Sequence, residues 1–204
     1  MAKLDKASGE CLKILLKDFS IGHTITSLSK EIGNTRMGIW KTLKKLQSDK
    51  LILLIPAGNG KTSTYLVRLN WDNRLVDKTL IMLLTEEALR YPRWLANFSE
   101  LEDKTDFLIL YGSILHSPKE AGDIDILGIV LDKGKFMEIN KIIEKIQITQ
   151  IKKIHLINLT EEELMKELIF QKNPAFIGAL KKGSILFGQE KFVKLIKTKL
   201  YREI

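Results

Sequence analysis

The chain has 204 residues, of which 45% are hydrophobic and 28% charged, and 33 Lys and Arg against 25 Asp and Glu give a net charge of +8. This composition excludes a disordered or fibrous chain, and the single cysteine, Cys11, excludes a disulfide framework or a cysteine-rich zinc module. No apolar run reaches the roughly 18 residues of a membrane span, and the basic start lacks the apolar core of a signal peptide. We therefore expect a cytoplasmic protein with no membrane partner.

The positive charge is concentrated near the N-terminus. Residues 1–75 hold 13 Lys and Arg against 6 Asp and Glu, which gives +7. The remaining residues hold 20 basic and 19 acidic side chains, which gives +1. This asymmetry predicts two modules with different partners, and only the first has the charge of a polyanion-binding module.

Two helices are expected in the first 33 residues. An apolar stripe in residues 8–19 predicts the first, with Gly22 after its end. Thr26 or Ser27 can cap a short second helix, which Gly33 ends.

A third helix and a hairpin follow. Asn34 or Thr35 can cap the helix, and its apolar positions, spaced by four and three residues, are Ile39, Leu43 and Leu46. Residues 51–55 and 64–69 then resemble strands, and the residues 56–62 between them are rich in turn formers. This pattern predicts a β-hairpin.

Helix, helix, helix and hairpin is the element order of a winged helix-turn-helix. The chain resembles the broad winged-helix family of bacterial and archaeal transcription regulators in its turn at Gly33, in the spacing of the apolar residues of the third helix, and in the run Lys50 to Ile52 that leads into the hairpin. The resemblance implies that double-stranded DNA is a partner, with the third helix in the major groove.

The predicted DNA-binding residues lie on the polar face of the third helix and on the hairpin: Thr35, Arg36, Met37, Trp40, Lys41, Lys44, Lys61 and Arg68. Arg and Lys side chains can reach guanine edges or phosphates from such positions. Trp40 is either a core aromatic residue or an exposed contact. The alternatives for the whole face are a solvated Lys-rich surface and a protein-docking surface.

Residues 72–104 have helical patterns, interrupted where Pro92 must end or kink a helix. Their apolar face is Leu75, Leu80, Leu83, Leu84, Ala88 and Leu89. Such a connector either packs between domains or forms a dimer interface. We expect a homodimer, because winged-helix regulators commonly pair to match two half-sites.

The most specific motif lies further on. Residues 107–111 resemble a buried strand that leads directly into Gly112 and Ser113, and after nine intervening residues Asp123 and Asp125 open a second strand-like run. Alternation along a strand places the two carboxylates on one face, about 7 Å apart. Carboxylates so placed can bind Mg2+, while Gly112 and Ser113 can approach phosphate oxygens.

This motif resembles that of the nucleotidyltransferase superfamily that includes polymerase β, in its minimal branch. Strand-like and helix-like stretches continue to the end, and the whole chain resembles archaeal proteins that fuse a winged helix to this domain. The resemblance implies Asp123 and Asp125 as catalytic residues and metal ligands, Gly112 and Ser113 as nucleotide-binding residues, and Mg2+ and an NTP as cofactors. The family's third acidic residue, on a later strand, has no counterpart: the aligned positions are His155 and Asn158.

We therefore expect an α/β (α+β) protein with a winged helix at 1–71, a helical connector at 72–104 and a nucleotidyltransferase-like mixed sheet at 105–204. The favoured function is a DNA-binding transcription regulator whose second domain binds NTP-Mg or mediates assembly. The alternative is an active, antitoxin-like nucleotidyltransferase that transfers NMP to a protein or nucleic acid. A protein that acts only through protein contacts is a third possibility.

Overall fold

The computed structural model describes residues 4–19, 22–57, 64–171 and 173–200. They form helices and two sheets, which confirms the predicted mixed α/β class. Backbone contacts divide the chain into unit 1, Met1–Leu83, and unit 2, Leu84–Ile204. The division falls inside α4 (Arg74–Ala88), so the predicted connector 72–104 is shared between the two units. Within the described ranges, no helix combines the length and apolar character that crossing a membrane requires.

Unit 1 begins with three capped helices: α1 (Lys6–Lys17), α2 (Ile25–Ile32) and α3 (Arg36–Ser48). Of the two predicted candidates, Asn34 and Thr35, it is Thr35 that caps α3, since its hydroxyl accepts the Gly38 N–H at 3.0 Å. The predicted cap of α2 is wrong. Thr24 is the cap, and it forms a reciprocal capping box with Ser27, which lies in the first turn. Gly33 ends α2 at a φ of 70°, the left-handed conformation that glycine adopts readily.

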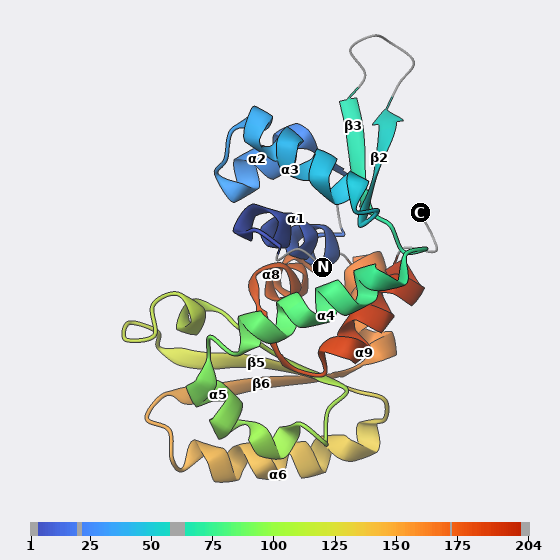
Figure 1. Ribbon diagram of the computed structural model, residues 1–204. Helices are drawn as coiled ribbons and strands as arrows, with labels where there is room; N and C mark the ends of the chain where they lie inside the picture. The colour runs from blue at the N-terminus through green and yellow to red at the C-terminus, as the bar shows by residue number, and fades with distance from the viewer. Residues whose placement is uncertain (1–3, 20–21, 58–63, 172, 201–204) are drawn as a thin grey trace. The chain divides into compact units, whose positions relative to one another are not determined.

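The sheet of unit 1 contains the predicted hairpin and one short strand that the sequence did not predict. Its order is β1 (His23–Thr24), β3 (Thr64–Leu69) and β2 (Ile52–Ala57), with antiparallel pairing throughout. The hairpin strands and the three helices are drawn in Figure 1. Their core is aliphatic, with Leu12, Leu16, Leu28, Ile39, Leu43, Leu46, Ile52 and Val67 buried.

Unit 2 is built on a four-stranded sheet. Its order is β6 (Lys153–Thr160), β5 (Asp123–Val130), β4 (Phe107–Tyr111) and β7 (Ser184–Phe187). β4 is antiparallel to both β5 and β7, whereas β5 and β6 are parallel. The parallel pair brings the N-terminal ends of β5 and β6 together at one edge of the sheet.

Helices cover both faces of this sheet. They are α5 (Pro92–Asn97), α6 (Phe136–Gln147), α7 (Glu161–Lys166), α8 (Pro174–Lys182) and α9 (Gln189–Leu195), with 3-10 turns at Ser99–Leu101, Ser113–Leu115 and Lys133–Lys135 and π-helical turns at Glu167–Gln171 and Ile196–Leu200. Pro92 opens α5 at its first position, as a helix boundary requires. Figure 1 shows α6 along one face of the sheet and α8 and α9 on the other.

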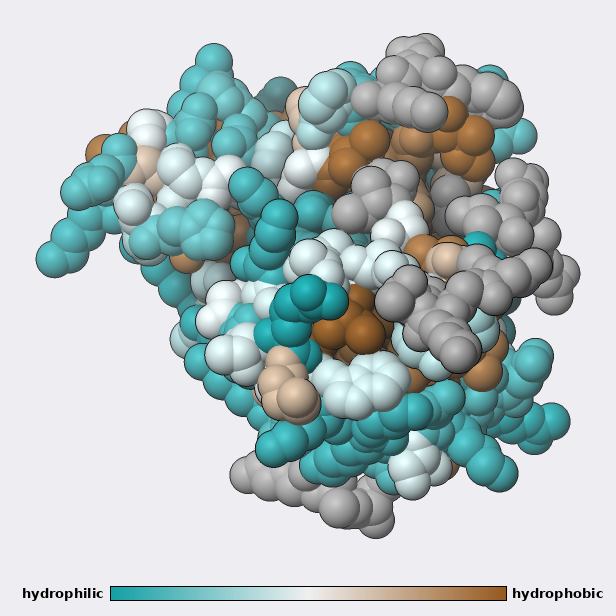
Figure 2. Space-filling model, turned by 90° about the horizontal axis from the view of Figure 1, so that it is seen from above, coloured by the Kyte–Doolittle hydropathy of each residue, from teal (hydrophilic) through white to brown (hydrophobic). Residues whose placement is uncertain are grey.

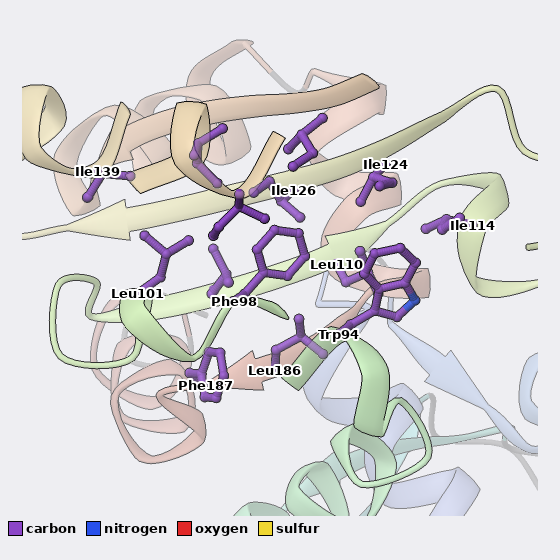
Figure 3. Packing of buried hydrophobic residues seen from close by; sticks show 14 of the residues in the cluster. Trp94, Phe98, Leu101, Leu110, Ile114, Ile124, Ile126, Ile139, Leu186 and Phe187 are labelled. Atoms are coloured by element: carbon purple, nitrogen blue, oxygen red, sulfur yellow. The ribbon is translucent and has the colours of Figure 1, made fainter. Parts of the chain in front are cut away.

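The buried cluster beneath α5 and α6 fixes the orientation of β5. Trp94 and Phe98 stack with ring centroids 6.0 Å apart, and Ile124 and Ile126 of β5 belong to the same cluster. Figure 3 shows these side chains converging between the sheet and the helices. Because successive strand residues point to opposite faces, burial of Ile124 and Ile126 directs Asp123 and Asp125 to the other face.

Candidate metal site and nucleic-acid interface

Three potential ligands meet at the start of β5. Asp125 is paired with Tyr111 of β4 on one side and with His155 of β6 on the other. Nδ1 of His155 lies 3.2 Å from Oδ2 of Asp123 and 3.6 Å from Oδ1 of Asp125. Ligand atoms from all three residues lie within 4.8 Å of one another. The structure thus brings together the two predicted aspartates and adds a histidine.

The other residue considered for the third position lies elsewhere. Asn158 is an odd number of residues from His155, so it points to the opposite face of β6. There its amide nitrogen donates to the Asn140 side chain of α6 at 3.0 Å. His155 therefore occupies the place beside the aspartates, a distinction that the sequence left open.

Gly112 sits directly against this cluster. Its φ of 82° is in the region that side chains rarely adopt, and a Cβ there would collide with the Asp125 carboxylate. The residue can therefore only be glycine if Asp125 is to keep its position. Ser113 follows at the start of a 3-10 turn and is exposed, and its hydroxyl hydrogen-bonds to no described residue.

Electrostatics at the cluster favours a cationic ligand. Burial raises the pKa of Asp125, the charge of Asp123 raises it further, and His155 opposes both effects. The pKa of Tyr111 is raised by burial and by the charges of Asp125 and Asp123. The two carboxylates repel each other, so a cation between them is favourable. Their side chains are 36% exposed for Asp123 and 25% for Asp125, so a divalent cation can reach them.

The donor set fits a divalent cation, with one distinction between metals. Two carboxylates supply the hard oxygen ligands that Mg2+ prefers. An imidazole nitrogen is less suited to Mg2+ and better suited to a transition metal such as Mn2+ or Zn2+. Asp123, Asp125 and His155 are the residues that would hold such an ion.

A candidate nucleic-acid surface lies on α3. Its buried side contains Ile39, Leu43 and Leu46. Met37, Lys41 and Lys44 are exposed on the side away from these residues, and Arg36 and the cap residue Thr35 are exposed at the start of the helix. Hydrophilic residues make up most of the described surface seen in Figure 2. Met37, Lys41 and Lys44 thus share one accessible side of the helix.

Trp40 joins this side of α3 to the hairpin. It is half-buried, its ring centroid lies 5.8 Å from that of Tyr65 on β3, and Nζ of Lys44 lies 4.6 Å above its ring. Trp40 is therefore neither a core residue nor a freely exposed one. Arg68, half-buried, points to the other face of β3 from Tyr65 by strand alternation, so it does not join the α3 surface. Lys61 lies outside the described residues.

A second acidic and histidine group, found only in the structure, lies in unit 1. Ligand atoms of Asp18, His23 and Glu31 lie within 4.8 Å of one another. Asp18 and His23 are buried, and Nε2 of His23 lies 2.8 Å from the Asp18 carbonyl oxygen. This contact fastens β1 to the end of α1, which gives the group a structural role.

Comparisons with protein-family models, with curated proteins and with solved structures each found no match to the chain. The function proposed for the chain therefore rests on its own residues and geometry.

Proposed function

We propose that the protein is a DNA-binding transcription regulator in which unit 1 contacts double-stranded DNA and unit 2 binds a nucleotide together with a divalent cation. The observation that carries this proposal is the exposed basic side of α3, the third helix before a β-hairpin. A helix of this kind fits the major groove, where Arg36, Lys41 and Lys44 would contact bases or phosphates.

Binding of labelled duplex DNA tests the proposal. The triple variant Arg36→Ala, Lys41→Ala, Lys44→Ala should bind about 100-fold more weakly or worse, since each lost contact costs about 1–3 kcal/mol. A matched control removes three exposed lysines of unit 2 by Lys135→Ala, Lys141→Ala and Lys166→Ala. Equal affinity of the α3 variant and the wild-type protein would refute the proposal.

The same proposal includes a homodimer, which would present two copies of α3 to two half-sites. The part of α4 in unit 1 exposes Leu75 at 49% and Met82 at 44%, seven residues apart on one helical side. Sedimentation of the Leu75→Glu, Met82→Glu variant should show a monomer. Leu131→Glu, at a position 76% exposed in unit 2, is the control that should remain dimeric.

A second function is favoured by the cluster at β5: transfer of a nucleotidyl group from an NTP to a protein or nucleic acid. An acceptor hydroxyl of that molecule would bond to the α-phosphorus, and pyrophosphate would leave with the electrons of the broken phosphoanhydride bond. Asp123, Asp125 and His155 would hold a divalent cation, which supplies charge stabilisation to the phosphoryl oxygens. Ser113 would donate its hydroxyl and backbone N–H to the phosphates, and Gly112 would let them approach the backbone closely. An antitoxin-like role, in which a partner protein is modified, is implied by the resemblance to minimal nucleotidyltransferases.

Incubation with labelled NTPs separates the enzyme from the nucleotide-binding regulator. Label transfer to a protein or nucleic acid that is lost in both Asp123→Asn and Asp125→Asn would support the enzyme. Transfer that survives both substitutions would exclude the assigned roles. Nucleotide binding without transfer would support the regulator.

The histidine gives the metal proposal a test that does not depend on turnover. Titration calorimetry should show tighter binding of Mn2+ than of Mg2+ to the wild-type protein, because His155 contributes a nitrogen donor. His155→Asp should shift the preference toward Mg2+. Asn140→Asp adds a carboxylate at an exposed position of α6 and should leave the preference unchanged. An unaltered Mn2+/Mg2+ ratio in His155→Asp would show that this residue is not a ligand.

A further inference from the structure

Unit 2 contains a pocket of about 390 Å³ on the opposite side of β5 from the metal-site aspartates. Ile124, which lies between Asp123 and Asp125 in the chain, is part of its wall. Ile114 of the 3-10 turn that begins at Ser113 is another part. Figure 3 shows both isoleucines near Trp94, which also lines the pocket. The volume is in the range of pockets that hold small organic ligands.

Of the described residues that line the pocket, two are cationic and none is acidic. The guanidinium of Arg93 stacks 4.9 Å from the Trp94 ring and donates to the Gln150 side chain at 3.3 Å. The Lys152 ammonium donates only to the backbone carbonyls of Lys119 and Ala121. Among the described residues, neither cation has an acidic partner, so the pocket has a net positive charge that a ligand can neutralise.

Trp94 adds an unused hydrogen-bond donor. The residue is only 6% exposed, and its indole N–H donates to no acceptor among the described residues. In Figure 3 the indole nitrogen is on the side of the ring away from Phe98. The nitrogen is not among the buried polar atoms that lack a partner, so it is open to solvent, and an acceptor atom of a ligand could replace water there.

We propose that this pocket binds a small organic anion, in which one carboxylate or phosphate group is attached to an apolar body. The anionic group would pair with Arg93 and Lys152 and accept the Trp94 N–H. The apolar body would pack against the exposed side chain of Ile151 and the small exposed edges of Ile114 and Ile124. The cation pair and the hydrophobic wall together select against both neutral apolar molecules and small inorganic anions.

Nuclear magnetic resonance of the full chain labelled with 15N tests whether the pocket binds such an anion. The readout is the indole N–H signal of Trp94, which is identified by its loss in Trp94→Phe. Phenyl phosphate and benzoate are the two anionic probes, and the tighter of them identifies the preferred head group. Benzyl alcohol is the neutral probe, and inorganic phosphate is the probe without an apolar body. We expect the preferred anion to shift the Trp94 signal and to bind about tenfold or more tightly than either comparison compound.

Substitutions locate the binding energy. Arg93→Gln combined with Lys152→Met should weaken the preferred anion about tenfold or more. Trp94→Phe should weaken it several-fold, measured from the backbone N–H signals because this variant lacks the indole signal. Lys141→Ala, which removes one exposed charge on α6, should have no effect. Failure of both anions to shift the Trp94 signal, equal binding of benzyl alcohol, or unchanged affinity in the double variant would each overturn the proposal. Because the measurement involves neither DNA nor a metal ion, its result is independent of the proposed function.

Discussion

At the scale of single residues, Asp5 joins two helices of unit 1 through one carboxylate. Its Oδ1 accepts the Ser8 N–H at 2.8 Å as the cap of α1, and its Oδ2 lies 2.9 Å from Nζ of Lys45 on α3. The hydrogen bond from Lys45 and the one from Ser8 lower the pKa of Asp5 from 3.8 to about 2. A carboxyl whose pKa is lower in the folded state stabilises the fold above its unfolded pKa.

The stability that Asp5 contributes should therefore be complete above about pH 4 and should disappear as the pH falls toward 2. Asp5→Ala should cost about 1 kcal/mol near neutral pH, because it removes the cap. Asp5→Asn retains a good cap and should lose less, but it should remove this pH dependence. Urea unfolding of the three proteins across this range measures both effects. If wild type and Asp5→Asn lose stability in parallel, Asp5 does not contribute through its charge.

Gly112 and Gly122 are two glycines of unit 2 that differ in what an added Cβ would meet. Gly112→Ala should lower cation affinity about tenfold or more and destabilise the fold by about 1–3 kcal/mol, since it forces a strained backbone and displaces Asp125. At Gly122 an added Cβ meets no atom within 4 Å and φ is not positive, so Gly122→Ala should be neutral. Calorimetric Mn2+ titration and urea unfolding test both. Equal effects at the two positions would contradict the assigned role of Gly112.

The candidate metal site could be predicted from the sequence only in part. The shared face of Asp123 and Asp125 follows from alternation within one strand, which is a local property. Selecting His155 over Asn158 requires the register between β5 and β6, and a slip of one residue would exchange the faces. Register is set by packing of the whole sheet, so it could not be derived from spacing along the chain.

At the scale of elements, the features predicted correctly are those that depend on residues close together in the chain. The strand 107–111 is confirmed, and Thr35, one of the two candidate caps of the third helix, is its cap. β1 was missed because its two residues acquire strand character only by pairing with β3. The start of α2 was placed too late because Thr24, Thr26 and Ser27 are all plausible caps, and only the backbone conformation identifies Thr24.

The apolar face of α4 was likewise predicted too broadly. Leu80 is fully buried, whereas Leu75, assigned to the same face, is 49% exposed. Leu80→Ala should therefore destabilise the protein by about 2–5 kcal/mol, the usual cost of truncating a buried leucine. Leu75→Ala should change stability by no more than about 0.5 kcal/mol. Urea unfolding compares the two, and similar losses would contradict the observed orientation of the helix.

At the scale of the whole molecule, the two units differ in charge. Residues 1–83 hold 14 Lys and Arg against 7 Asp and Glu, which gives +7, whereas residues 84–204 hold 19 against 18, which gives +1. Moving the boundary from residue 75 to residue 83 adds one charge of each sign, so the asymmetry does not depend on where α4 is divided. Long-range attraction to a polyanion would thus arise in unit 1, while anion binding in unit 2 depends on local groups.

The difference in charge between the two units predicts how the affinity for DNA depends on salt concentration. The same measurement distinguishes direct contacts to phosphates from a general effect of net charge. The affinity of unit 1 for duplex DNA should fall steeply with salt, because each neutralised phosphate contributes about −0.9 to the slope of log affinity against log salt concentration. Substituting Arg36, Lys41 and Lys44 by alanine should make the slope shallower by as much as about 2.7 if all three contact phosphates, and by less if some read base edges. The unit 2 triple control lowers the net charge equally but removes no contact, so its slope should equal that of the wild-type protein. Equal slopes for the wild-type protein and both variants, measured by fluorescence anisotropy over a series of salt concentrations, would show that α3 does not contact the phosphate backbone.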